Sequence, residues 1–224
     1  MKGSGYEFEP LVYDWNEPRS PISNHVGRRL FNEQIASQYG YHTGPASPYK
    51  LKMRAQLDSF AAQSQRWVEQ WDSCSAQVFA EEPFSSMYSS SGVYFTSNVT
   101  NDEVEQAVGK WRECMAPLGV SDLPDSPEDM PSDSLAQKFG LDAADPVNGI
   151  ESTSVSGEEI KTAIHDARCQ QSSGYRQAYY QAEWDSDQAI VSGNKDALEA
   201  RRQQVQTNTE ELKKIITDYI KGNS

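Results

Sequence analysis

The sequence is short of hydrophobic residues, of basic residues and of long apolar stretches. Hydrophobic residues make up 37% of the 224 residues, and counting glycine in place of tyrosine hardly changes this. The roughly 45–50% usual for globular domains is higher, so the core must be thin for the length. No stretch of about 18 apolar residues occurs, which predicts no transmembrane helix in this chain. With 20 Lys and Arg against 33 Asp and Glu, the net charge of −13 disfavours nucleic-acid backbones and anionic lipid surfaces as partners.

Cysteine and histidine are equally scarce, with three of each: Cys74, Cys114, Cys169, His25, His42 and His165. The cysteines form no CxxC pair and we find no histidine at metal-ligand spacing from them, so zinc is disfavoured. The sequence contains no HxxxH, no GxSxG elbow, no GxGxxG motif and no P-loop. These absences predict a non-enzymatic protein with no metal and no cofactor.

The sequence does contain the caps and apolar stripes of helices. Residues 1–23 hold three prolines among aromatic residues and predict an extended arm that packs on the body. A helix then begins at Asn24 and ends at Gly40. A long helix follows from Pro48 until Pro83 stops it. A capping box at 100–103 begins a helix that buries Trp111 and Met115.

The second half begins with an acidic surface loop over 121–155, which contains a short helix from Ser132 to Phe139. A capping box at Ser156 begins a helix of roughly 35 residues that ends near Gly193, and Asn194 caps the last helix. The fold class is therefore all-α: a bundle of about six helices with long loops and a C-terminal antiparallel αα-hairpin around Gly193. Residues 24–224 form a single helical domain.

Three aromatic side chains are candidates for ligand binding. Trp15, Tyr180 and Trp184 could line a groove for a sugar or a peptidoglycan fragment. The competing interpretation is that aromatic residues at helical spacing belong to the core, which is their usual place.

An internal repeat bears on the odd number of cysteines. Cys114-Met115 is followed by Gly119 with the same Met-to-Gly spacing as Met1 and Gly5. If the two segments are related, a cysteine preceded Met1 in a longer precursor and four cysteines formed two disulfides.

The chain resembles an uncharacterised family of secreted or lipid-anchored cell-envelope proteins from actinobacteria. The likeness covers most of the chain in order and rests on three short motifs: Tyr39-Gly40-Tyr41, Trp111-x-x-Cys114-Met115-x-x-x-Gly119 and Arg168-Cys169-x-x-x-x-Gly174. Members usually open with Cys-Met-x-x-x-Gly-Tyr after a lipoprotein signal, and Met1 to Tyr6 match that opening from its second residue. The resemblance implies a lipid anchor upstream and an accessory role beside an ABC exporter. The family has no established activity, so the resemblance implies none for this chain.

The helical pattern also predicts a disulfide between Cys114 and Cys169. Cys169 lies on the second apolar face of its helix, and the helix of Trp111 is the natural neighbour for that face. Cys74 then stays as the odd cysteine of this chain. The alternatives are a Cys74–Cys114 bond, or three reduced thiols.

These observations predict a non-enzymatic extracytoplasmic envelope protein, membrane-anchored or secreted, that binds a protein or a small molecule. One alternative is an enzyme acting on the cell wall or on a small substrate, through a site that no motif reveals. The other is a cytosolic helical interaction protein, which would keep all three thiols reduced.

Overall fold

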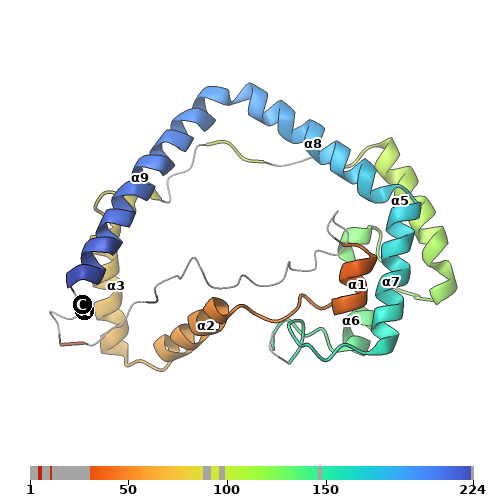
Figure 1. The fold of residues 1–224 in the computed structure, drawn as a ribbon, viewed down its shortest axis with the longest axis horizontal. Helices are drawn as coiled ribbons and strands as arrows, with labels where there is room; N and C mark the ends of the chain where they lie inside the picture. Colours follow the sequence, from red (N-terminus) through yellow and green to blue (C-terminus); the bar gives the residue numbers. More distant parts are fainter. Residues whose placement is uncertain are drawn as a thin grey trace. The chain divides into compact units, whose positions relative to one another are not determined.

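The computed structural model describes residues 5–6, 11, 31–87, 92–95, 99–145 and 148–222, and most of these are helical. Over them the chain forms nine α-helices, two short 3-10 helices and no β-strand (Figure 1). The predicted all-α class is confirmed. None of the described helices combines the length and the apolar character that crossing a membrane requires.

The chain groups into two compact units, whereas the sequence predicts a single domain. Unit 1 comprises Met1–Tyr13, Lys52–Thr96 and Asp187–Ser224, and unit 2 comprises Asp14–Leu51 and Ser97–Ser186. The predicted arm over 1–23 lies almost wholly outside the described residues.

Unit 2 is built around helix α7 (Gly157–Ser172). Helices α1 (Glu33–Tyr39) and α5 (Asp102–Met115) both pack against α7, and α6 (Asp133–Phe139) lies near them (Figure 1). The largest buried side chains in this core are aromatic or sulfur-containing: Phe31, Tyr41, Trp111, Met115 and Cys169. The Trp111 and Met115 stripe of the sequence therefore faces the core as expected.

The helix caps of unit 2 differ from the prediction at two places. Phe31 and Asn32 are not helical, and the Asn32 side chain accepts a hydrogen bond from the Ile35 N–H, so α1 begins at Glu33. The predicted cap at Asn24 lies outside the described residues. Asn101, and not Thr100, caps α5, because its Oδ1 accepts the Val104 N–H at 2.9 Å. Ser156 caps α7 as predicted.

The acidic region over 121–155 is more ordered than a plain surface loop. It contains a 3-10 helix at Pro127–Asp129, and α6 ends at Gly140 as predicted. The Asp122 carboxylate accepts hydrogen bonds from the Ser134 N–H, at 2.8 Å, and from the hydroxyls of Ser132 and Ser134. These hydrogen bonds lower the pKa of Asp122 and fix the start of α6.

The long helix predicted from Pro48 to Pro83 is interrupted, and the sequence pattern does not show where. The predicted helix from Pro48 to Pro83 is two helices, α2 (Pro48–Ala61) and α3 (Gln65–Phe79), because Ser64 caps a new helix start. The Phe60 ring then lies 5.1 Å from the Trp67 ring. A short helix, α4 (Phe84–Met87), follows directly after Pro83.

Helix α4 packs on the last helix, α9 (Lys195–Gly222). The Arg201 guanidinium donates to the backbone carbonyls of Ser86 and Met87, and the buried Asn208 amide donates to the Ser86 hydroxyl at 2.8 Å. Apolar residues recur every seven positions along this helix, at Leu198, Val205, Leu212 and Tyr219. Arg201 and Asn208 stand between them where a second apolar row would continue, and their contacts with α4 explain why they are polar.

The predicted 35-residue helix is likewise two helices. Helix α7 ends at Ser172, Gly174 has a φ of 80°, and α8 (Tyr175–Gly193) begins after it. Between α8 and α9 only Asn194 is non-helical, which is shorter than the two to five residues typical of helical hairpins. The predicted hairpin would pair residues of both units and stays a prediction.

Candidate functional site

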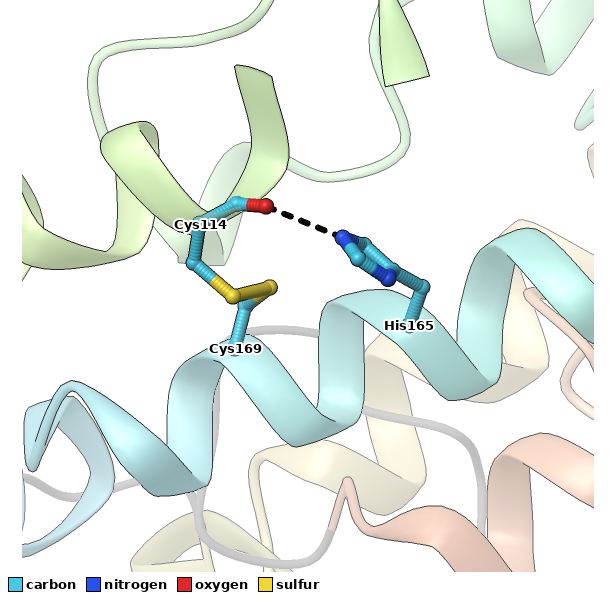
Figure 2. Close-up of side chains that lie close together, drawn as sticks. All are labelled: Cys114, His165 and Cys169. Carbon is cyan, nitrogen blue, oxygen red and sulfur yellow. Dashed lines mark hydrogen bonds between the residues drawn. A yellow bond between two sulfur atoms is a disulfide. The ribbon is translucent and has the colours of Figure 1, made fainter. Parts of the chain in front are cut away.

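The two cysteines expected to pair meet between α5 and α7. Cys114 lies in the last turn of α5 and Cys169 in the last turn of α7, with their Sγ atoms 1.97 Å apart and their Cα atoms 5.5 Å apart (Figure 2). Cys169 is completely buried. This is the geometry of a disulfide, and it joins two helices of the unit 2 core. Cys74 lies on α3 of unit 1 and takes no part in this pair.

His165 lies beside the two sulfur atoms. It precedes Cys169 by four residues on α7, so both side chains project from the same face of the helix. The His165 Nε2 atom is 3.0 Å from the backbone carbonyl oxygen of Cys114 (Figure 2). A carbonyl oxygen can only accept, so Nε2 carries the hydrogen, and in the neutral tautomer with that hydrogen the lone pair is on Nδ1.

Together these residues present a metal-ligand set that the sequence analysis missed. One ligand atom from each of Cys114, His165 and Cys169 lies within 4.8 Å of the other two. The expectation that no histidine lies at metal-ligand spacing from a cysteine is wrong, since His165 and Cys169 are four residues apart on one helix. That spacing is the signal that could have found two of the three. The third comes from another helix, 51 residues earlier in the chain.

A second cluster of polar groups is buried against the same helix. The Asp166 side chain is completely buried, and its carboxylate accepts hydrogen bonds from Trp111 Nε1 at 2.8 Å, Gln170 Nε2 at 3.0 Å and the Tyr41 hydroxyl at 3.2 Å. Burial raises the pKa of Asp166 to about 6, against the lowering effect of these hydrogen bonds. Burial, followed by the neighbouring Asp166 charge, raises the pKa of Tyr41 well above its ordinary value.

Glu159 joins α7 to the end of α1. Its Oε1 accepts the Tyr41 N–H at 2.8 Å and lies 2.8 Å from His42 Nδ1, with both side chains buried. In a capping box this side chain would return to its own helix start, but here it reaches across to another helix. Glu159, Asp166 and their partners are enclosed in the core, so they hold α1, α5 and α7 together and are not exposed to a substrate.

A hollow in the described part of unit 2 lies at the junction of α7 and α8. It has a volume of about 420 Å³ and is lined by Gln171, Gly174, Arg176, Gln177 and Tyr180. The Arg176 guanidinium donates to the Gln171 side-chain oxygen at 2.9 Å. Burial lowers the pKa of Arg176. The hollow is therefore lined by amide, guanidinium and phenol groups that can form hydrogen bonds with a ligand.

The structure places two of the three predicted binding aromatics together. Tyr180 lines the hollow, and the half-exposed Trp184 ring lies 6.2 Å from the Tyr180 ring, one turn further along α8. The core interpretation does not describe Trp184, because half of that side chain is in solvent. Trp15 lies outside the described residues.

None of the protein-family models, curated sequences or solved structures compared with this chain matches it.

Proposed function

We propose that this chain is a non-enzymatic protein of the cell envelope, on the outer side of the cytoplasmic membrane, and that it works by binding a partner. The observation that carries the proposal is the Cys114–Cys169 pair in the unit 2 core. Disulfides persist in oxidising compartments and are rare in the cytosol. The resemblance to lipid-anchored and secreted envelope proteins points the same way and adds an accessory role beside an export system.

The positions of two buried carboxylates favour binding over catalysis, because these groups lie in the core and not in the hollow. The carboxylates of Glu159 and Asp166 are enclosed in the core. The hollow beside Tyr180 is lined instead by two glutamines, an arginine, a glycine and that tyrosine. Such groups hold a ligand by hydrogen bonds and ring contacts, which suits a polar ligand such as a cell-wall glycan fragment. Among these lining residues there is no pairing of a nucleophile with a base.

Localisation is tested in cells that carry the natural gene, using a tagged copy of the chain. Protease added outside cells stripped of their wall should digest the chain, and Cys114 and Cys169 should resist alkylation until a reductant is added. A cytosolic helical protein would survive the protease and show three alkylated cysteines. That result would refute the proposed compartment.

Ligand binding is tested by titrating the purified chain with oligomers of N-acetylglucosamine and following tryptophan fluorescence. We expect saturable quenching that the Gln177→Ala substitution weakens and the Gln188→Ala substitution, on an exposed position of the same helix, does not. Equal effects of the two substitutions would exclude the hollow as the site. Chromatography of the same mixtures should show intact oligomers, whereas shortened oligomers would support the enzyme alternative.

A further inference from the structure

We propose that reduction of the Cys114–Cys169 disulfide converts this part of unit 2 into a zinc site, with the two thiolates and His165 as protein ligands. The inference goes beyond the binding function proposed above and does not depend on it. It rests on three donor atoms that two helices bring together and on the hydrogen bond that orients the imidazole.

The distances between the donor atoms fit a zinc ion after a small movement. Zinc binds thiolate sulfur at about 2.3 Å and imidazole nitrogen at about 2.0–2.1 Å in tetrahedral geometry, which places ligand atoms about 3.5–3.8 Å apart. In the structure the donor atoms of the three residues lie within 4.8 Å of one another. Once the sulfur–sulfur bond is broken, side-chain rotations that move the donor atoms by about 1–2 Å bring them to the separations found around zinc. A water molecule can take the fourth position.

The surroundings of His165 are those of a metal ligand. Histidines that bind metals usually donate their other ring N–H to a carbonyl or carboxylate, which fixes the ring and the tautomer. The Cys114 carbonyl oxygen already accepts the His165 Nε2–H at 3.0 Å. In that tautomer Nδ1 is the ring nitrogen that can bind the ion, and the residue that fixes the tautomer is itself a ligand.

Charge balance favours the metal in the reduced chain. Cys169 is completely buried, and a thiolate buried without a counter-charge is costly. A zinc ion with two thiolates and a neutral imidazole has no net charge. The ion therefore stabilises the deprotonated form of both cysteines, and it again links α5 to α7.

The chemistry balances with a dithiol as reductant. The disulfide takes two electrons and two protons from the dithiol, which closes to its own disulfide, and yields two cysteine thiols. Each thiol then loses one proton to solvent as the zinc ion binds. In the reverse step the disulfide formed from that dithiol accepts two electrons from the two thiolates and two protons from solvent, which re-forms the Cys114–Cys169 bond, removes both sulfur ligands and releases the ion. The oxidised form and the zinc form are thus mutually exclusive.

The test uses the full chain with Cys74→Ser, so that only the cysteine pair can respond. One sample stays oxidised, and the other is reduced with a phosphine, which is removed under argon before zinc is added. We expect one zinc ion per reduced chain and none per oxidised chain, measured with a chromogenic zinc indicator. Cobalt(II) in place of zinc should give the intense thiolate-to-metal charge-transfer absorption of a tetrahedral site.

Two substitutions on α7 separate a metal site from unspecific binding. His165→Gln should weaken zinc binding by more than about tenfold, since the loss of a residue that merely orients a ligand already costs about 10–100-fold. Lys161→Gln, exposed and one turn earlier on the same helix, should leave it unchanged. The proposal is overturned if the reduced chain binds no more zinc than the oxidised chain, or if the two variants bind zinc equally well. Circular dichroism of each variant shows that the helices persist.

Discussion

Replacing Cys114 and Cys169 by alanine should lower the free energy of unfolding of unit 2 by about 4 kcal/mol. The two cysteines are 55 residues apart in sequence. For a loop of that length the chain-entropy relation gives about 14 cal/mol/K, or about 4 kcal/mol at 25 °C. A domain has only about 5–15 kcal/mol in total, and each kcal/mol corresponds to about 2–4 °C in a chain of this size, so Tm should fall by about 10 °C.

The loss should be confined to the helices that the disulfide joins. Hydrogen exchange measured by mass spectrometry resolves the peptides of α5 and α7 from those of α3 and α9. We expect faster exchange in α5 and α7 and unchanged exchange in the unit 1 helices, which serve as an internal reference. The matched control is Cys74→Ser, on α3 and outside the pair.

Two results would refute the reasoning. If the double alanine variant unfolds within about 1 kcal/mol of the Cys74→Ser control, the pair contributes no constraint to the unfolded chain. If instead the control is the destabilised variant, Cys74 has the structural role that is here assigned to Cys114 and Cys169.

Three further predictions test the packing of each unit. Gly40→Ala should lower the free energy of unfolding, measured in urea, by about 2–4 kcal/mol, since φ is 57° and a new Cβ would meet buried carboxyl atoms. Gly140→Ala is the control, because φ is 68° but the space around it is open, and it should cost about 1–2 kcal/mol. Equal costs would rule out the clash at Gly40. The pKa of Asp166 is raised above its ordinary 3.8 to about 6, so the native chain keeps a proton that the unfolded chain releases. Stability should therefore fall by up to about 3 kcal/mol as pH rises from 4 to 6, and Asp166→Asn should abolish that fall in urea denaturation at each pH. Asn208→Ala should cost about 1–3 kcal/mol and speed hydrogen exchange in α4 and α9, whereas Gln206→Ala, on the exposed face, should change neither.

The fold class and many helix ends could be predicted because caps and stripes are local signals. Ser156 caps α7, Gly140 ends α6, and Trp111 lies in the core as its spacing indicates. The interruptions could not be predicted in the same way. Ala62 to Ser64 span three residues, close to one helical turn of 3.6, so the apolar stripe keeps its phase across the break and reads as one helix.

The buried polar cluster was missed because sequence patterns assign charged residues to the surface. Glu159 and Asp166 are both within the core of unit 2, where Tyr41 and His42, just after α1, and Trp111 of α5 satisfy them. Those partners are more than 50 residues away in sequence, so no local pattern could identify them. Two of the three metal-ligand residues could have been predicted, however, since His165 and Cys169 already share one helix face.

The division of the chain into units affects how the protein can be made and cut. Unit 1 is assembled from three separate segments and unit 2 from two, and the boundaries between Leu51 and Lys52 and between Ser186 and Asp187 fall inside α2 and α8. No single truncation therefore isolates either unit, and a fragment that ends before α8 removes part of both. During synthesis unit 2 is incomplete until Ser186 has left the ribosome, and unit 1 until most of α9 has followed. The usual order, in which an N-terminal domain folds before the next is made, is not open to this chain.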